Sequence, residues 1–525
     1  MVNIFNTLFL KFIFFILSIH CIQTSAQGIG GFISVEPLPQ SSNFIIPSTH
    51  IYQKIIEEGD TLTEGGYLPK NNDFTGYVPI NGNSRNGYLS INSESTPGGV
   101  SILDIQFNQT TKLWETTRSQ SVNFDSVGGT ARNCSGTITP WNTVISCEES
   151  ISILDTNNDN RNDLGWCIEI NPVSKTVIDK RWALGNFKHE NIVVHDNERT
   201  VYEGADSDPG YLYKFVAENS QDLSKGSLYV YRGSKNGAGN WILINNTTPS
   251  DQNITLTQSA NVGATVFRGI EDVEIGPDSL IYFAVKGENS VYRFKDSDPI
   301  SGTTVTQMET YVGNASYIIE HENGATLVDW GTGNDNLAFD GDSNLWVLQD
   351  GGNNHIWLVE NNHTQSSPKV KIFGLTPKGA EPTGITFTPD YKFLFMSIQH
   401  PSSSNSASQI DAAGNIIDFN TNISLVIARK ENLGDSALST KKNVLKEHTS
   451  FYPNPSTGKF NIKLKKTYPD IEISVSTLDG KFIVRKKINA TNEINLDLSK
   501  ELAGIYLIEI KSNNRIIDVI KAVMK

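Results

Sequence analysis

Four acidic residues stand at the same place in four similar stretches of the chain, each directly before a short strand-like run. They are Glu190, Glu271, Asp335 and Glu381. Each run is followed by a turn rich in Pro, Asp or Gly and then by a second run with aromatic side chains. If the first strands ring a channel, their carboxylates meet at one mouth, where they repel one another unless hard cations such as calcium neutralise them. The alternative is that each acid caps a turn by accepting backbone N–H groups.

A cysteine lies in the polar, glycine-bounded run 128–136, where Cys134 follows Arg132 by two positions. A thiolate beside an arginine in a tight loop is a candidate metal ligand or nucleophile, although small polar turns also hold inert cysteines. Cys147 and Cys167 sit instead in apolar strand-like runs, where a disulfide or plain burial accounts for them. Once a leader with Cys21 is removed, three cysteines remain, so at least one thiol is free, pairs between chains or binds something.

Strands must position these residues, because helical periodicity is nearly absent between residues 85 and 430. Short alternating apolar runs separated by Gly, Asn, Asp and Pro recur there, with turns spaced as in the blades of a β-propeller. We therefore predict an all-β chain with a β-propeller body. A β-sandwich repeated twice is the alternative architecture.

The charge is unevenly distributed along the 525 residues, whose formal net charge is −14. Residues 441–525 hold 16 Lys and Arg against 9 Asp and Glu, whereas the preceding part holds 27 against 48. An acidic body argues against unaided nucleic-acid binding, which needs a basic surface to displace counterions. The division predicts a large acidic body followed by a small basic domain.

The N-terminus has the features of an export signal. The apolar run Leu8–Ile19 is short for a membrane span, and Thr24-Ser25-Ala26 offers a small-residue cleavage site. We predict a Sec-type signal peptide over 1–26 and a secreted or surface-attached mature chain without a transmembrane segment. An uncleaved anchor, or a lipoprotein acylated at Cys21, is the alternative.

The basic C-terminal part is predicted to be a linker, 441–450, followed by a small β-sandwich, 451–525. Alternating strands are expected in this part at 460–464, 471–476, 482–488, 494–498, 504–510 and 516–523. Its motifs are Tyr452-Pro453-Asn454-Pro455, Leu478-Asp479-Gly480, Leu502–Tyr506 and Lys521–Lys525. These motifs resemble the type A C-terminal sorting domain of the type IX secretion system of Bacteroidetes. The resemblance implies that the type IX secretion machinery is a partner of this chain. A carbohydrate-binding or adhesive sandwich is the rival interpretation.

Specific side chains follow one another in a fixed order in the body. The segments are Thr130–Gly136 with Arg-Asn-Cys, Thr139–Thr143 with Pro-Trp, Ser146–Glu149 with Cys-Glu-Glu, Phe187–Glu190, Gly210–Val216, Asp335–Asp340 and Glu381–Gly384. Together they resemble the signature of PhoX-type alkaline phosphatases, in order from about Phe124 to Pro401. The resemblance implies a six-bladed β-propeller, here residues 27–440, that hydrolyses small phosphate esters with calcium and iron.

The resemblance also implies a ligand set, with Cys134 as the ligand of Fe³⁺ and carboxylates holding Ca²⁺ beside it. The implied carboxylates are Glu149, Glu190 and Glu271, with Glu148, Asp335 and Glu381 as further candidates. Arg132 or Arg268 is a candidate to hold phosphate oxygens through a bidentate guanidinium, and an ion pair with neighbouring acids is the alternative for both. Two other functions stay open: a calcium-stabilised propeller that binds or adheres without turnover, and a lactonase-like metal hydrolase.

Overall fold

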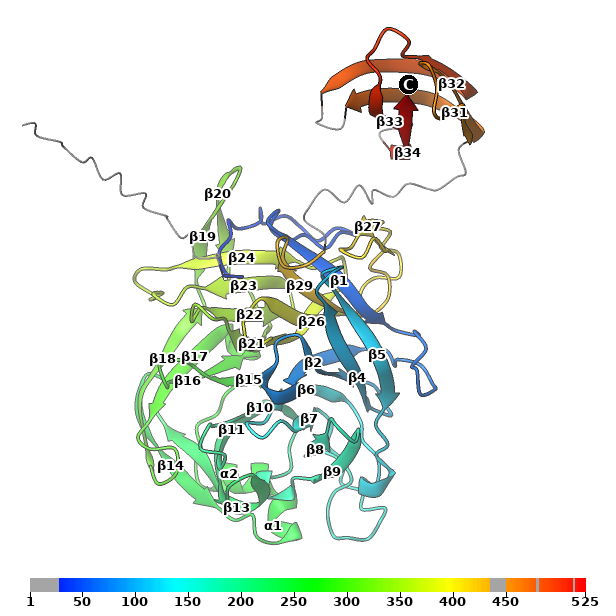
Figure 1. The fold of residues 1–525 in the computed structure, drawn as a ribbon. Coiled ribbons are helices and arrows are strands. Elements are labelled where there is room, and N and C mark those ends of the chain that lie inside the picture. The colour runs from blue at the N-terminus through cyan, green and yellow to red at the C-terminus, as the bar shows by residue number, and fades with distance from the viewer. Residues whose placement is uncertain (1–27, 435–449, 478–480, 513–514) are drawn as a thin grey trace, which may run out of the picture.

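The computed structural model describes residues 28–434, 450–477, 481–512 and 515–525. The proposed signal peptide 1–26 and nearly all of the proposed linker 441–450 lie outside these residues. Sheets dominate the described part of the chain (Figure 1). Within it, no helix has the length and apolar character that crossing a membrane requires.

Residues 28–434 form six groups of four antiparallel strands, each built outward from a first strand. We name each group by that strand. The first strands are β2 (Asn72–Pro79), β6 (Asn133–Ile138), β10 (His189–Val194), β15 (Ile270–Ile275), β21 (Asn334–Phe339) and β25 (Glu381–Phe387). Each first strand contacts the next, and β25 contacts β2, so the first strands form a closed ring.

The outer strands complete each group in chain order. The second strands are β3 (Asn86–Ser93), β7 (Val144–Glu148), β11 (Thr200–Ala205), β16 (Ile281–Val285), β22 (Leu345–Gln349) and β26 (Phe393–Gln399). The third are β4 (Gly99–Asn108), β8 (Cys167–Asn171), β12 (Leu212–Asn219), β17 (Ser290–Asp296), β23 (His355–Val359) and β29 (Ile423–Arg429). The fourth are β5 (Leu113–Ser121), β9 (Thr176–Lys180), β13 (Asp222–Gly233), β18 (Thr304–Gly313), β24 (Val370–Leu375) and β1 (His50–Glu57).

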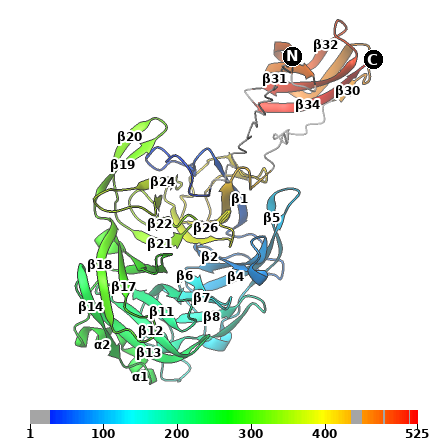
Figure 2. The same cartoon turned by 60° about the vertical axis from the view of Figure 1, so that its left-hand side comes forward.

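The β25 group joins the two ends of the body. Its fourth strand, β1, comes from the start of the described chain and pairs antiparallel with β29, so that Ile51 lies opposite Ala428. Backbone hydrogen bonds across this pair tie the beginning of the body to its end. Hydrogen bonds between β1 and β29 therefore close the ring of strand groups, and β1 lies near β26 of the same group in Figure 2.

The predicted all-β propeller architecture is confirmed. The number of blades stays a prediction, because β14 (Gly237–Ile244) pairs with both β13 and β18 and joins the β10 and β15 groups into one nine-stranded sheet. Two short helices, α1 (Pro249–Asn253) and α2 (Thr255–Asn261), follow β14. The hairpin β19 (Ser316–His321) and β20 (Gly324–Asp329) and the short pair β27 (Gln409–Ile410) and β28 (Ile416–Ile417) are further additions.

The apolar runs of the sequence are continuous because the strands are buried on both faces. All five residues of β22 are buried, and successive side chains of a strand point to opposite faces. Trp346 and Leu348 pack into one hydrophobic cluster with residues of the β25 group, while Leu345 and Val347 pack into another with residues of the β15 group. Each sheet therefore holds its two neighbours through alternate side chains, as stacked blades do.

The C-terminal domain is built from fewer and longer strands than its sequence suggests. They are β30 (Ser450–Tyr452), β31 (Lys459–Thr477), β32 (Phe482–Asp497), β33 (Gly504–Ser512) and β34 (Arg515–Met524). The expected separate strands 460–464 and 471–476 are both part of β31, whose pairing with β32 shifts register between Lys463 and Tyr468. Side chains from both halves of β31, such as Phe460 and Ile473, pack into one buried core. The strands of a single sheet therefore enclose the core that two layers enclose in a sandwich.

Candidate metal centre

Each first strand carries a potential metal ligand at or near its beginning that belongs to one common set. These residues are Asp73, Cys134, Glu190, Glu271, Asp335 and Glu381. We call this set the inner ring. Because the first strands themselves close into a ring, the side chains at their starting ends are brought to one mouth of the central channel.

Irregular pairing aims most of these side chains into the channel. In five of the six groups the register between the first and second strand shifts at the ligand, as between Asn72 and Thr75 on either side of Asp73. Such bulges re-aim a side chain out of the regular alternation of a strand. The β25 group differs, because Glu381 pairs regularly with Gln399 and the shift follows Thr383.

A second ring surrounds the first, and its members stand immediately after the second strand of each group. They are Glu94, Glu149, Asp206, Lys286, Asp350 and His400. We call this set the outer ring. In an antiparallel pair the end of the second strand lies beside the start of the first, so each outer-ring residue is placed next to an inner-ring residue.

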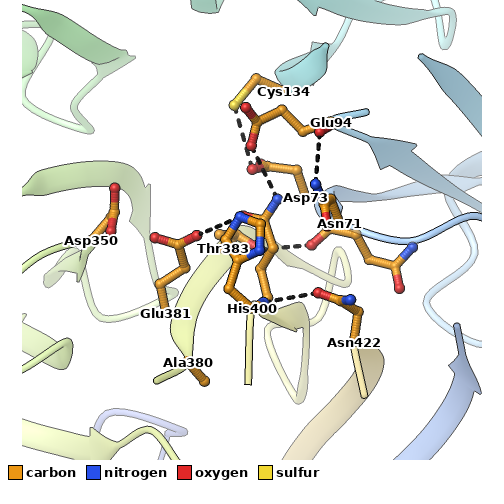
Figure 3. Close-up of polar contacts among 12 residues, drawn as sticks. Asn71, Asp73, Glu94, Cys134, Asp350, Ala380, Glu381, Thr383, His400 and Asn422 are labelled. Atoms are coloured by element: carbon orange, nitrogen blue, oxygen red, sulfur yellow. Dashed lines mark hydrogen bonds and ion pairs between the residues drawn. The ribbon is translucent and has the colours of Figure 1, made fainter. Parts of the chain in front are cut away.

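The acids and the thiol form one continuous cluster. Three triplets have ligand atoms that all lie within 4.8 Å of one another: Asp73–Glu94–Cys134, Cys134–Glu149–Glu190 and Glu190–Asp206–Glu271. Cys134 and Glu190 each belong to two triplets and so connect them. Figure 3 shows the Cys134 thiol directed at Asp73, at 3.4 Å from Oδ2, with Glu94 beside the pair.

Cationic side chains contact the cluster from its edge. The Arg132 guanidinium donates to Glu149 Oε2 at 2.6 Å and also contacts Glu94, and Lys188 Nζ lies 3.2 Å from Glu149 Oε1. Arg132 has a φ of 50°, a left-handed conformation that is strained for a non-glycine residue and frequent at functional sites. Its backbone is fixed there by donation to Ser95 O at 2.8 Å.

On the opposite side of the cluster, Lys286 Nζ lies 2.9 Å from Asp350 Oδ2 and 3.6 Å from Glu271 Oε1. His400 Nε2 lies 3.4 Å from Glu381 Oε1 (Figure 3). Lys286 and His400 thus reach acids of the β15, β21 and β25 groups. Burial lowers the pKa of His400, so Lys286 is the cation of the two, and it balances only part of the negative charge gathered there.

The electrostatics of the cluster oppose ionisation. Burial, followed by the proximity of other acids, raises the pKa of Asp73, of the Cys134 thiol and of Glu190 well above their ordinary values. Burial and Glu149 raise the pKa of Glu94 to about 7. Burial also acts to raise the pKa of Glu149, but the hydrogen bond from Arg132 holds it below its usual range. The protein alone cannot keep all of these groups charged.

The donor set fits metal cations. Asp73 Oδ1 and Glu271 Oε1 are buried and accept no hydrogen bond in the described structure, and leaving buried carboxylate oxygens without a partner is costly. Cations would satisfy these oxygens and favour the ionised forms of the acids. Several carboxylates suit hard ions such as calcium, whereas a thiolate suits a transition metal.

The structure brings most of the expected residues together. Cys134, Glu149, Glu190, Glu271, Asp335 and Glu381 all belong to the two rings. Arg132 lies at their edge. The other two expected residues lie elsewhere, for reasons that follow from strand geometry.

Glu148 points away from the channel. It is fully buried, its Oε1 lies 3.1 Å from Lys180 Nζ, and its Oε2 accepts the Gly165 N–H at 2.9 Å. Neighbouring residues of a strand point to opposite faces, so Glu148 cannot accompany Glu149 into the cluster. Arg268 is also apart: its side chain is 62% exposed and lies 3.4 Å from Asp208.

Sequence reasoning missed Asp73, Glu94, Asp206 and Asp350. A signal for Asp73 existed, because it occupies in the β2 group the place that Glu190 and Glu271 occupy in theirs. The part of β2 that follows Asp73 contains Thr, Gly and Tyr, so it lacks the apolar run that marks the other copies of the repeated pattern. Glu94, Asp206 and Asp350 of the outer ring carry no flanking motif, and only the end of the second strand identifies them.

Comparison with known proteins agrees with this geometry. The family model "Alkaline phosphatase PhoX" matches residues 105–402, and the model "Secretion system C-terminal sorting domain" matches residues 450–525. The solved structure of Pseudomonas fluorescens PhoX in complex with vanadate, a transition state analogue, has a TM-score of 0.59 at 21% identity and covers 77% of this chain and 98% of that chain.

Two further solved structures are less similar than this one. A streptogramin B lyase has a TM-score of 0.35 at 11% identity, covering 73% of this chain and 97% of its own. A virginiamycin B lyase from Staphylococcus aureus has a TM-score of 0.33 at 12% identity, covering 72% and 99%. Comparison with curated proteins gives no match. Since the family model spans more than half of the chain and includes Cys134, the chain belongs to the PhoX family of alkaline phosphatases and is a metal-dependent phosphoric ester hydrolase.

Proposed function

We propose that the inner and outer rings hold calcium and iron ions, and that the chain uses them to release inorganic phosphate from small phosphate esters outside the cell. The observation that carries the proposal is the meeting of one thiol and several buried acids from the first strands, with Asp73 Oδ1 and Glu271 Oε1 accepting no hydrogen bond in the described structure. A propeller that binds calcium only to stabilise its fold needs oxygen ligands, and a thiol in the cluster would not serve it.

The residues divide by ligand chemistry. Cys134 is the soft donor and would hold iron, with Glu149 and Glu190 completing the same triplet. Carboxylate oxygens of Asp73, Glu271 and the neighbouring acids would hold calcium, which takes several oxygen ligands. Cations bound in this way supply the Lewis acidity that neutralises the oxygens of a phosphate ester during hydrolysis.

The protein's own contribution is to attract and orient the ester. Arg132 is fixed by Glu149 and Glu94, yet its side chain remains 44% exposed at the edge of the cluster. A guanidinium held in place can donate to phosphate oxygens without losing further side-chain freedom. Lys188 and Lys286 add positive charge on two sides of the acids, which lowers the repulsion that an incoming dianion meets.

We also propose the following domain boundaries. The signal peptide would comprise residues 1–26, the propeller 27–440, the linker 441–450 and the sorting domain 451–525. The sorting domain indicates secretion or attachment to the cell surface. We propose that it acts through the type IX secretion machinery and that residues 1–26 direct the first membrane crossing.

The test combines metal analysis with p-nitrophenyl phosphate hydrolysis on the purified full chain. We expect both calcium and iron, and phosphatase activity that is lost together with the iron in Cys134→Ala. A thermal melt shows that the variant is folded. Protein that contains calcium alone and does not hydrolyse the ester would refute the proposal, as would a Cys134→Ala variant with unchanged iron and activity.

A further inference from the structure

A second cluster of ligating side chains lies outside the channel, between the β6 and β10 groups. It consists of Cys147 on β7, Cys167 on β8, His189 on β10 and Glu203 on β11. All four residues are fully buried, with 0% exposure. His189 directly precedes Glu190, so the two side chains leave the strand in different directions, Glu190 toward the inner ring and His189 toward Cys167.

Three of the four side chains already form a compact group, and the fourth, Cys147, adjoins that group through Cys167. Cys147 Sγ lies 3.8 Å from Cys167 Sγ, and Cys167 Sγ lies 3.3 Å from His189 Nδ1. His189 Nδ1 lies 3.3 Å from Glu203 Oε2. The ligand atoms of Cys167, His189 and Glu203 all lie within 4.8 Å of one another.

The hydrogen bonding of His189 leaves a lone pair facing the cluster. Nε2 lies 3.0 Å from Gly185 O, and because a carbonyl oxygen can only accept, Nε2 carries the proton. In the neutral imidazole Nδ1 is therefore the acceptor, and it faces Glu203 Oε2, another acceptor. A backbone carbonyl that fixes the outer nitrogen is also the usual arrangement behind a metal-bound histidine.

Glu203 is the unsatisfied member of the cluster. In the described structure neither oxygen accepts a hydrogen bond from a neutral imidazole, although the side chain has no contact with solvent. A second proton on His189 would make its Nδ1, 3.3 Å from Oε2, the donor of an ion pair, which is the metal-free alternative to the proposal. Isolating a carboxylate in this way is expensive unless it is paired or coordinates a metal. Burial raises the pKa of the Glu203 carboxyl and of the Cys167 thiol, which is the cost of holding these acidic groups without a cation.

We propose that Cys147, Cys167, His189 and Glu203 form a tetrahedral site for Zn²⁺. With Zn–S distances of about 2.3 Å and Zn–N and Zn–O distances of about 2.0–2.1 Å, a tetrahedron places two sulfurs about 3.8 Å apart. The same geometry separates sulfur from nitrogen by about 3.6 Å and nitrogen from oxygen by about 3.3 Å. The observed separations along the series Cys147–Cys167–His189–Glu203 are 3.8, 3.3 and 3.3 Å, which match three edges to within a few tenths of an ångström. Cys147 lies outside the group whose ligand atoms are all within 4.8 Å of one another, so its side chain must turn toward His189 and Glu203 to close the tetrahedron.

Such a site would be structural, because four protein ligands close the coordination sphere and leave no position for a substrate. It would cross-link β7 and β8 of one group to β10 and β11 of the next. These strands also place Glu149, Glu190 and Asp206 in the two rings. Bound zinc would therefore brace three carboxylates of the phosphatase centre without touching it.

A disulfide is the competing arrangement, since Cys147 and Cys167 lie directly opposite each other on paired strands. A disulfide would remove both thiolates from the site. It would leave Glu203 and the His189 lone pair facing each other without a cation, so it explains fewer of the observations. The two arrangements differ in metal content and in thiol count, which makes them separable.

The test measures zinc in the purified full chain by mass spectrometry of the elements. We expect about one equivalent of zinc in the wild type and in the control Cys134→Ser, which lacks the thiol of the channel but keeps the second site. In Cys167→Ser and Glu203→Gln we expect zinc to fall on the order of tenfold or more. Equal zinc in Cys167→Ser and in the wild type would overturn the proposal. So would zinc-free wild type in which peptide mapping shows Cys147 joined to Cys167.

A spectroscopic measurement keeps the proposal falsifiable if the ligand variants do not fold. The Cys134→Ser chain is stripped of metal and loaded with Co²⁺, which replaces zinc in such sites. We expect the intense visible bands of tetrahedral cobalt and a thiolate charge-transfer band, both abolished when Zn²⁺ is added. Absence of these bands in folded Cys134→Ser would refute the site.

Discussion

The Cys134 thiol lies 3.4 Å from Asp73 Oδ2, across the contact between β6 and β2. The thiol donates this hydrogen bond, and so it is protonated in the arrangement described. Burial raises the pKa of both groups; the negative charge of Asp73 adds to the rise at Cys134, whereas the hydrogen bond from Cys134 acts to lower the pKa of Asp73. A cation that binds here must displace the thiol proton, which couples metal binding to proton release.

Asp73→Asn tests whether the residue that the sequence did not reveal belongs to the centre. We expect kcat/KM for p-nitrophenyl phosphate to fall on the order of a hundredfold, with loss of bound calcium or iron, because the amide removes an anionic ligand. The metal-free variant should melt at a higher temperature than the metal-free wild type, since the native state no longer has to bury a carboxyl whose pKa is raised above its value in the unfolded chain.

Both readouts for Asp73→Asn come from the same preparation, before and after chelation. Loss of a metal ligand lowers activity but raises the melting temperature of the metal-free protein. General damage to the fold would lower both activity and melting temperature. Wild-type metal content in an active Asp73→Asn protein would show that Asp73 is not a ligand.

The stability of the metal-free protein should fall as the pH rises. The pKa of Glu94 is raised by burial and by Glu149 from 4.5 to about 7, so the native state keeps a proton that the unfolded state releases between these values. The unfolding free energy then decreases as the pH rises through that window, because the native state binds more protons there. Thermal melts of chelated protein at pH 5 and pH 8 measure this difference.

Calcium should oppose the loss of stability at high pH, because it stabilises the ionised acids. We expect the melting temperature at pH 8 to rise on addition of Ca²⁺ by more than it rises at pH 5, where protons compete for the same oxygens. NaCl at matched ionic strength is the control for screening. Equal melting temperatures of the chelated protein at the two pH values would contradict the prediction.

The two candidate arginines should differ sharply. Arg132 contacts Glu149 and Glu94 of the cluster, whereas Arg268 is mostly exposed and lies near Asp208. For Arg132→Ala we expect kcat/KM to fall about tenfold to a hundredfold, the range of one hydrogen bond to a charged group. Arg132→Lys should recover part of the loss, since it keeps the charge but not the planar fork.

Arg268→Ala is the matched control in the same assay, and we expect its kcat/KM to stay within about twofold of the wild type, as for an exposed ion pair. A larger effect at Arg268 than at Arg132 would reverse our assignment of these two residues.

The fold was readable from the sequence where strands are buried on both faces. Residues 345–348 form a continuous apolar run because alternate side chains pack against different neighbouring groups, and such runs recur with similar turns. The pairing of β1 with β29 was not readable, because no local pattern says which distant strand completes a group. The long strands of the C-terminal domain were predicted as shorter ones, since a register shift resembles a turn in one dimension.

The candidate site was readable only in part, for a similar reason. Glu190 and Glu271 stand out because an acid before an apolar strand is unusual, and the role of Cys134 came from the family resemblance. The choice between Glu148 and Glu149 depends on which face of β7 looks into the channel, which only the register decides. The outer-ring acids Asp206 and Asp350 look like surface loop residues until the ends of their strands are placed in space.

Gly269 shows how closely backbone approaches the centre, and its substitution makes the last prediction. It has a φ of 74°, and a Cβ there would lie 2.8 Å from Asp206 Oδ1 and 3.5 Å from Glu271 Oε1. Gly263 has a similar φ of 66°, but a Cβ there would meet nothing within 4 Å. Alanine at either position should cost about 1–2 kcal/mol of stability through the left-handed backbone.

Only Gly269→Ala should also displace the two carboxylates. We therefore expect both variants to melt at lower temperature, while Gly269→Ala alone loses bound metal and at least about tenfold in kcat/KM for p-nitrophenyl phosphate, as when ligand positioning is disturbed. The comparison removes backbone strain as an explanation, because Gly263→Ala carries the same strain into open space. If the two variants kept equal metal content and equal activity, Asp206 and Glu271 would not form a ligand pair whose geometry the centre requires.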